Sequence, residues 1–99
     1  MKLFSSVVVL TFAFLSSSVF SADIEAGKAK SATCVACHGP AGVSTNPLWP
    51  NLAGQHAAYL AKQIKAFRDG DRSDPLMAPM VAALTDEDIT NLAAYYAAQ

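Results

Sequence analysis

The residues with the clearest chemical capacity are five consecutive ones, Cys34-Val35-Ala36-Cys37-His38. Two thiols three positions apart are spaced to add to the two vinyl groups on one edge of a porphyrin, and the adjacent histidine is then held under the iron as proximal ligand. Covalent attachment retains the haem where a small domain buries too little area to hold it. The motif predicts one covalent haem c, with Cys34 and Cys37 as thioethers and His38 as an axial iron ligand.

Three other functions of the same cysteines are weaker alternatives. A thioredoxin-like redox pair requires a βαβ context, which this sequence lacks. A structural zinc site requires four ligands, and beyond the motif His56 is the one remaining candidate; we expect His56 to face solvent instead. A disulfide suits an exported protein, but a bridge across two residues closes a small loop and stabilises little.

The second axial ligand decides what such a haem does. A methionine thioether raises the iron potential and closes the site to small molecules, which favours an electron carrier over a gas binder or a catalyst. Met77 and Met80 share one loop, far in sequence from His38, as a ligand from the opposite haem face should be. Because methionine also fills core gaps, one of the two is expected to bind iron and the other to pack. Local sequence chemistry does not show which of the two methionines binds the iron.

Two helices are expected to flank the motif. Asp23 is a good N-cap for a first helix that runs towards Cys34. A second helix is predicted from about His56 to Asp69, with Gly70 as the residue that ends it. Its apolar face is indicated by residues spaced i, i+4 and i+7: Leu60, Ile64 and Phe67.

The last helix has the strongest start signal. Thr85 is predicted to cap it, with Asp88 three residues on and acidic side chains in the first turn, where the helix dipole favours them. Its apolar stripe comprises Ile89, Leu92, Ala93 and Tyr96.

Loops separate these helices. Glycine, proline and asparagine punctuate residues 39–54, and so long a loop in so small a domain is expected to wrap something. Pro75 and Pro79 are expected to block helix on either side of Met77. Because no segment alternates convincingly as a strand, the predicted fold class is all-α.

The N-terminus has the features of a secretory signal peptide. Lys2 is followed by the apolar run Leu3–Leu15 and the small polar cluster Ser16–Ser18. The apolar run is too short to span a bilayer as a helix. We therefore predict a signal peptide over residues 1–22, cleaved within one residue of Ala22, and one domain over residues 23–99. Export to the periplasm follows, with no stable membrane insertion after cleavage.

The charge pattern excludes some partners. The chain has seven basic and eight acidic residues, for a formal charge of −1. A near-neutral balance gives no electrostatic footprint for nucleic acid and no polybasic patch for a membrane. The sequence shows no Ser/His/Asp set, carboxylate pair or phosphate loop, so no enzymatic active site is predicted.

With the haem motif in place, residues 23–98 resemble the class I c-type cytochromes, in particular small soluble bacterial periplasmic mono-haem members and the single domains of their two-haem relatives. The resemblance is carried by six stretches: Ala26-Gly27-Lys28-Ala29, Cys37-His38-Gly39, Pro50-Asn51-Leu52-Ala53-Gly54, Asp74-Pro75-Leu76-Met77-Ala78-Pro79, Leu84-Thr85-Asp86-Glu87-Asp88-Ile89 and Leu92-Ala93-Ala94-Tyr95.

The resemblance implies a compact cytochrome c fold of about three main helices wrapped around one covalently attached haem. It implies that the Pro50 carbonyl accepts a hydrogen bond from His38 and fixes the orientation of that ring. The ligand methionine of the family lies seven residues before the leucine that precedes the last helix cap, which selects Met77 and leaves Met80 as the fallback. Gly27 is expected where the first and last helices cross.

The function implied is that of a periplasmic single-electron carrier with His/Met ligation. It would be a monomer that docks transiently with redox protein partners, and it would not itself be an enzyme. One alternative is a haem c subunit of a periplasmic dehydrogenase or oxidase complex. A haem-based ligand sensor is the other, and it requires that neither methionine bind the iron.

Overall fold

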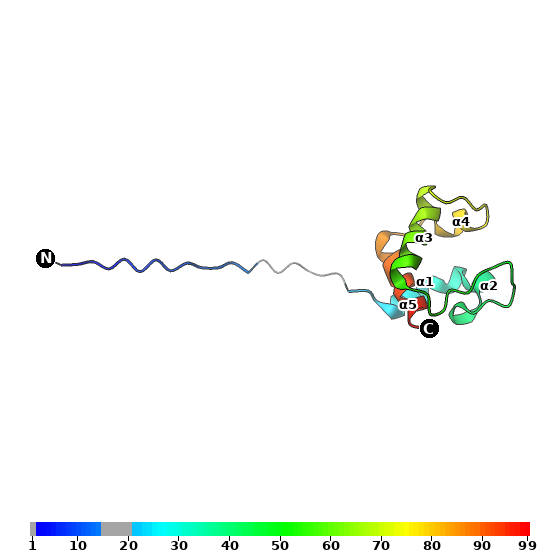
Figure 1. Ribbon diagram of the computed structural model, residues 1–99, viewed down its shortest axis with the longest axis horizontal. Helices are drawn as coiled ribbons and strands as arrows, with labels where there is room; N and C mark the ends of the chain where they lie inside the picture. Colours follow the sequence, from blue (N-terminus) through cyan, green and yellow to red (C-terminus); the bar gives the residue numbers. More distant parts are fainter. Residues whose placement is uncertain (1, 15–20) are drawn as a thin grey trace.

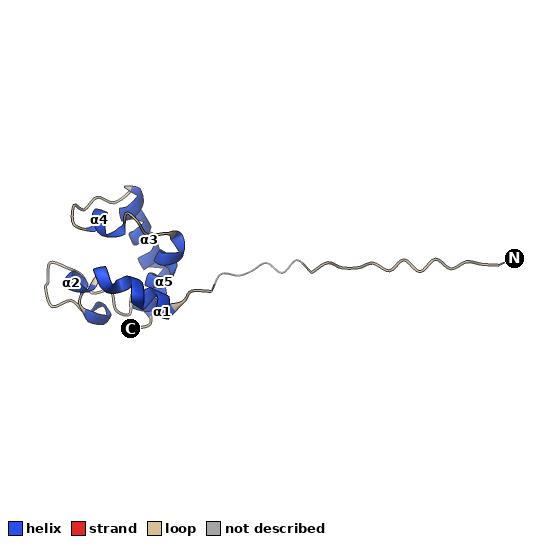
Figure 2. Cartoon of the chain, turned by 180° about the vertical axis from the view of Figure 1, so that it is seen from behind, coloured by secondary structure: helices blue, strands red, loops and turns tan. Residues whose placement is uncertain are grey.

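The computed structural model describes residues 2–14 and 21–99, and over these residues it contains helices and loops but no strand (Figure 2). The predicted all-α class is confirmed. The three longest helices, α1, α3 and α5, correspond to the three predicted from sequence. The elements in chain order are α1 (Ile24–Lys30), a 3₁₀ turn (Ser31–Thr33), α2 (Val35–His38), a second 3₁₀ turn (Pro40–Gly42), α3 (Ala57–Asp69), α4 (Met77–Val81) and α5 (Asp86–Ala97).

Residues 2–14 extend away from the helical domain with their side chains exposed (Figure 1). The polar cluster Ser16–Ser18 lies outside the described residues. Within the described part of the chain, no helix is long and apolar enough to cross a membrane. The division into a signal peptide over 1–22 and a domain over 23–99 stays a prediction.

Helices α1 and α5 cross in direct backbone contact at Gly27. The side chain of Asp23 caps α1 by accepting from the Ala26 amide at 3.0 Å, and the Asp23 amide donates to Asn91 Oδ1 at 2.8 Å. A Cβ on Gly27 would lie 2.1 Å from the Asn91 carbonyl oxygen and 2.9 Å from Tyr95 Cβ. Glycine is therefore required at this crossing, as the resemblance implied.

Helix α5 supplies most of the core. Thr85 and Asp88 form the predicted capping box, in which each side chain accepts from the other residue's amide at 3.0 Å. The predicted apolar stripe is buried. The core cluster combines residues of α5 with one of α3: Leu92, Ala93, Tyr95 and Tyr96 with Leu60. Leu60 is the buried residue of α3, and its packing against these residues fixes α3 against α5.

Helix α4 corrects one expectation. Pro79 was predicted to block helix, yet it is the third residue of α4. That prediction was wrong because the first amides of a helix have no intrahelical acceptor, so a proline there removes no hydrogen bond. The Asp74 carboxylate accepts from the amides of Leu76 at 2.8 Å and Met77 at 3.0 Å, and thereby starts the helix.

These elements form two arms joined at α3 and α5. In Figure 1, α2 and the loop that follows it lie on one side, and α4 lies on the other. Helix α5 packs against both α1 and α3, and α4 packs against α3. Both arms project from the same side of the helical core and face each other (Figure 1).

Candidate haem site

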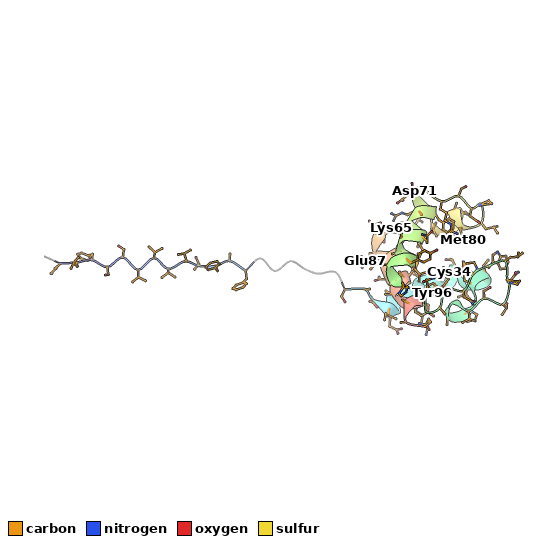
Figure 3. The ribbon with its side chains drawn as sticks, in the orientation of Figure 1. Cys34, Lys65, Asp71, Met80, Glu87 and Tyr96 are labelled. Atoms are coloured by element: carbon orange, nitrogen blue, oxygen red, sulfur yellow. The ribbon has the colours of Figure 1, made fainter. Side chains whose placement is uncertain are left out.

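A cavity of about 690 Å³ lies between the two arms. Figure 3 shows two of its lining residues, Cys34 and Met80, coming from opposite arms of the molecule. It is lined by the haem-motif residues, the loop, α3 and α4 together. Its lining residues include three of the motif, two selected by the resemblance and two from the predicted apolar face of α3: Cys34, Cys37, His38, Pro50, Met77, Leu60 and Ile64.

His38 is the last residue of α2 and is 7% exposed. Its Nδ1 lies 2.7 Å from the carbonyl oxygen of Pro50. A carbonyl oxygen can only accept, so this contact assigns the proton to Nδ1 and leaves Nε2 with its lone pair free for a metal. The arrangement is the one by which metal-binding histidines are held in orientation.

The loop that presents the Pro50 carbonyl is pinned by backbone hydrogen bonds. The Gly42 carbonyl accepts from the amides of Leu52 at 2.8 Å and Ala53 at 3.1 Å, and the Gly54 amide donates to the Tyr96 carbonyl at 2.9 Å. Gly42 has φ 80°, and a Cβ there would lie 2.7 Å from the Tyr96 ring. The loop is thus fastened to α5, and Pro50 is placed by tertiary contacts.

Cys34 and Cys37 are half-buried, unbridged and both on the cavity wall. The amides of Cys37 and His38 donate to the Cys34 carbonyl at 3.3 Å and 2.9 Å, so the three residues form a single turn. That turn presents two thiols and the imidazole to the same cavity. Within the described residues, no group of three or more His, Cys, Asp or Glu side chains is placed to hold a metal ion.

Both candidate methionines lie on α4, at its first and fourth positions, and both line the cavity. Residues three apart share a helix face, which explains why local sequence did not separate them. Met77 is half-buried, whereas Met80 is 51% exposed. Asp74 also holds the amide of Met77.

Further polar residues reach the wall of the cavity. Trp49, Tyr59 and Gln63 line it, whereas His56 is exposed and lies outside the lining, as expected. Arg72 also lines it, stacked over the Phe67 ring at 4.4 Å.

The sequence did not predict that the hydroxyl of Tyr96 is buried beside the cavity. Tyr96 is 1% exposed and lines the cavity, and its hydroxyl has no hydrogen-bond partner among the residues that the structure describes. Burial, together with the neighbouring Cys34, raises the pKa of Tyr96 above its usual value. Figure 3 shows Tyr96 beside Cys34. The periodicity of α5 identifies Tyr96 as a core residue, but it carries no information on where the hydroxyl points.

The residues of the cavity fit a covalently bound haem. Two thiols and an oriented imidazole lie on one side, two thioethers on the other, and apolar side chains of α3 between them. A large apolar cavity with an orphaned hydroxyl inside a small domain is otherwise costly, since empty space and unpaired polar groups both destabilise. A planar, largely apolar cofactor would fill this space.

Comparison with known proteins supports this assignment. The Cytochrome c family profile matches residues 24–97. Cytochrome c-554(548) of Halomonas halodenitrificans is 52% identical over 80 residues, which cover 78% of this chain and 96% of that protein. The solved cytochrome c4 of Acidithiobacillus ferrooxidans superposes with a TM-score of 0.74 at 30% identity, over 85% of this chain and 54% of that one.

A third relative has a more specific name. The thiosulfate dehydrogenase electron acceptor of Stutzerimonas stutzeri is 46% identical over 67 residues, which cover 65% of this chain and 31% of that protein. This chain therefore spans nearly all of the Halomonas protein, but about half or less of the two longer ones.

The chain belongs to the cytochrome c family. It is a bacterial-type class I c-type cytochrome, an electron carrier whose cofactor is covalent haem c.

Proposed function

We propose that this protein is a periplasmic single-electron carrier in which His38 and Met77 are the axial ligands of one haem iron and Cys34 and Cys37 are its thioether links. The observation that carries the proposal is that these four side chains line one cavity, with the His38 ring held by the Pro50 carbonyl at 2.7 Å. Haem c, when bound, supplies one-electron exchange between the ferric and ferrous states of its iron.

The protein contributes a fixed and water-poor environment. The Pro50 carbonyl prevents rotation of the imidazole and so holds the ring in one orientation as a metal ligand. Leu60, Ile64 and Phe67 form an apolar wall along α3. The Tyr96 hydroxyl is uncharged at neutral pH, because the ordinary pKa of tyrosine is 10.0 and burial raises it further, so it brings no charge into the cavity. Such surroundings favour transfer of an electron without movement of the ligands.

Met77 is preferred to Met80 for two reasons. It occupies the position of the family pattern, seven residues before Leu84. It is also the less exposed of the two, and its amide is held by Asp74. Met80, one turn further along α4, is left to cover the opening.

Partner proteins would dock transiently at the cavity mouth, with the carrier acting as a monomer. Four large apolar side chains that line the cavity remain at least half exposed: Leu48, Tyr59, Leu76 and Met80. A small apolar patch suits weak redox encounters, in which little area is buried.

A second candidate function is that of a haem c subunit in a dehydrogenase complex. It is favoured by the similarity to the thiosulfate dehydrogenase electron acceptor. Affinity isolation of the tagged protein from periplasm at low salt separates the two. A stoichiometric enzyme subunit that co-purifies would establish the complex, whereas isolation as a monomer would support the free carrier.

The site is tested by optical spectra of the purified protein, oxidised and reduced. A thioether-linked low-spin haem with the weak far-red band of methionine sulfur on ferric iron is expected. Met77→Ala should abolish that band, and Met80→Ala should retain it. The reverse result would exchange the two assignments, and haem without such a band in the wild type would favour the sensor.

The mass of the mature protein, with haem added and residues 1–22 removed, tests the predicted export.

A further inference from the structure

The two ends of the segment that carries Met77 are joined by one side chain. This segment, residues 70–84, leaves α3 at its C-terminus and leads into α5. Arg68, in the last turn of α3, donates from Nη1 to the carbonyl oxygen of Leu84 at 3.0 Å. Its Nη2 lies 2.8 Å from Oδ1 of Asp86, the first residue of α5. One guanidinium thus links the start of the segment to its end.

The other anchors of the segment lie nearer its start or within it. The Arg72 amide donates to the Ala66 carbonyl at 3.0 Å, and Asp74 organises the start of α4. At the far end, the Leu84 amide donates to Val81, which belongs to the same segment. Among the described residues, the hydrogen bond that ties this end to α3 is the one from Arg68 to Leu84.

We propose that Arg68 is a positioning residue for the axial ligand: by clamping both ends of residues 70–84, it keeps Met77 against the haem iron. The inference depends on the proposed ligation by Met77. Arg68 does not line the cavity and would not touch the haem, so it acts through the backbone of the segment.

The chemistry of arginine suits this task. The Arg68 side chain is 19% exposed, and Asp69 binds its Nε at 2.8 Å, so the guanidinium is oriented before it reaches Leu84. A planar guanidinium can donate to a carbonyl and two carboxylates at once, which an ammonium group on a flexible stem cannot do with the same geometry. Because the carboxylates of Asp69 and Asp86 are more than half exposed, solvent screens both ion pairs, and the bond to the Leu84 carbonyl contributes most to the clamp.

Weakening the clamp should expose the iron to competing ligands. An external ligand such as imidazole binds only when the methionine has moved away, so its apparent affinity scales with the fraction of molecules in which the segment is open. Loss of hydrogen bonds from a charged donor should raise this fraction about tenfold. Arg68→Gln is therefore expected to tighten imidazole binding to the ferric protein by about tenfold.

The experiment compares imidazole titrations of the haem-loaded wild type, Arg68→Gln and Arg68→Lys. The lysine variant keeps the positive charge but loses the planar guanidinium, so its affinity for imidazole should fall between those of the wild type and Arg68→Gln. Asp88→Asn is the matched destabilised control, because Asp88 caps α5 and pairs with Lys30 without contacting the segment. Lys62→Gln controls for loss of one positive charge on α3. Both controls should bind imidazole within about twofold of wild type.

Amide hydrogen exchange provides a second readout in the same haem-loaded proteins. Exchange of the Met77 and Ala78 amides should accelerate in Arg68→Gln about as much as imidazole binding tightens, whereas core amides of α5 should change less. If Arg68→Gln does not fold, Arg68→Lys and Asp86→Asn, which removes the ion pair but leaves the Leu84 bond, provide the same comparison with smaller expected effects.

The outcomes separate this inference from the proposed function. A wild type without the methionine band refutes the ligation on which the inference depends. A wild type with that band, together with Arg68 variants whose imidazole affinity and exchange match those of Asp88→Asn, refutes the clamp alone. Tighter imidazole binding in the Arg68 variants than in both controls establishes it.

Discussion

Replacing Gly27 by alanine tests the backbone contact between α1 and α5. The added Cβ would lie 2.1 Å from the carbonyl oxygen of Asn91 and 2.6 Å from its carbonyl carbon. An ordinary contact between carbon and oxygen is about 3.3 Å or more, so α1 and α5 would have to separate by about 1 Å. The obstacle is backbone, and no side-chain rotamer can relieve it.

The magnitude follows from three contributions. Overpacking against a rigid neighbour costs about 3 kcal/mol at the upper end of the usual range. Separation of the helices also weakens the bond from the Asp23 amide to Asn91 Oδ1, worth about 1 kcal/mol. Alanine regains about 1 kcal/mol of helix propensity over glycine. The net loss is about 3 kcal/mol, which in a domain of this size lowers Tm by about 12 to 24 °C.

Thermal unfolding of the haem-loaded protein, followed by far-ultraviolet circular dichroism, measures this loss. Ala29→Gly is the matched control, because Ala29 is exposed on the same helix and the change should cost about 1 kcal/mol of helix propensity alone. If Gly27→Ala were as stable as wild type or more so, the direct backbone contact between α1 and α5 would be wrong.

Three further predictions concern single features of the fold. Tyr96→Phe should leave stability unchanged or raise it by about 1 kcal/mol, since it deletes an unpaired buried hydroxyl; a clear loss in thermal unfolding would show that the hydroxyl has a partner in the haem-loaded protein. Hydrogen bonds from Thr85, chiefly from its amide, with a smaller contribution from Lys30, hold the pKa of Asp88 below its ordinary value of 3.8. Its carboxylate therefore stabilises the fold above that pH and loses this effect as the pH falls towards the lower folded value, so acid titration of Asp88→Asn should show a shallower loss of stability than wild type. Gly70 has φ 88° and open space around the position that a Cβ would take. Gly70→Ala should therefore lower the stability of the protein by about 1 kcal/mol, and Gly70→Asn by less. Equal urea midpoints for the two variants would contradict the left-handed cap.

Features decided within a few residues were predictable from the sequence. The capping box joins Thr85 and Asp88, three residues apart, and α3 ends at Gly70 because glycine readily adopts the left-handed conformation found there. The exception is Pro79, where the expected helix block did not occur. The rule that proline breaks helices depends on its position in the helix, and that position was set by the Asp74 carboxylate upstream.

The candidate site was only partly predictable. The spacing of Cys34, Cys37 and His38 indicates haem attachment without any structure, because one turn of chain presents all three. Met77 was selected by the resemblance, because local sequence features do not distinguish two methionines that lie on one face of α4. The Tyr96 hydroxyl in the cavity and the clamp of Arg68 on Leu84 were not foreseen. They depend on how α3, α4 and α5 are set against one another.

By itself, the sequence predicted the chemistry of this protein: a motif for haem attachment, helices with their caps and apolar faces, and a near-neutral charge. Those properties are local, because they depend on residue type and on spacing along the chain. The tertiary structure decided that His38 contacts the Pro50 carbonyl, that α1 contacts α5 at Gly27, and that residues of both arms line one cavity. These contacts join residues distant in sequence, and their geometry is fixed only when the helices pack.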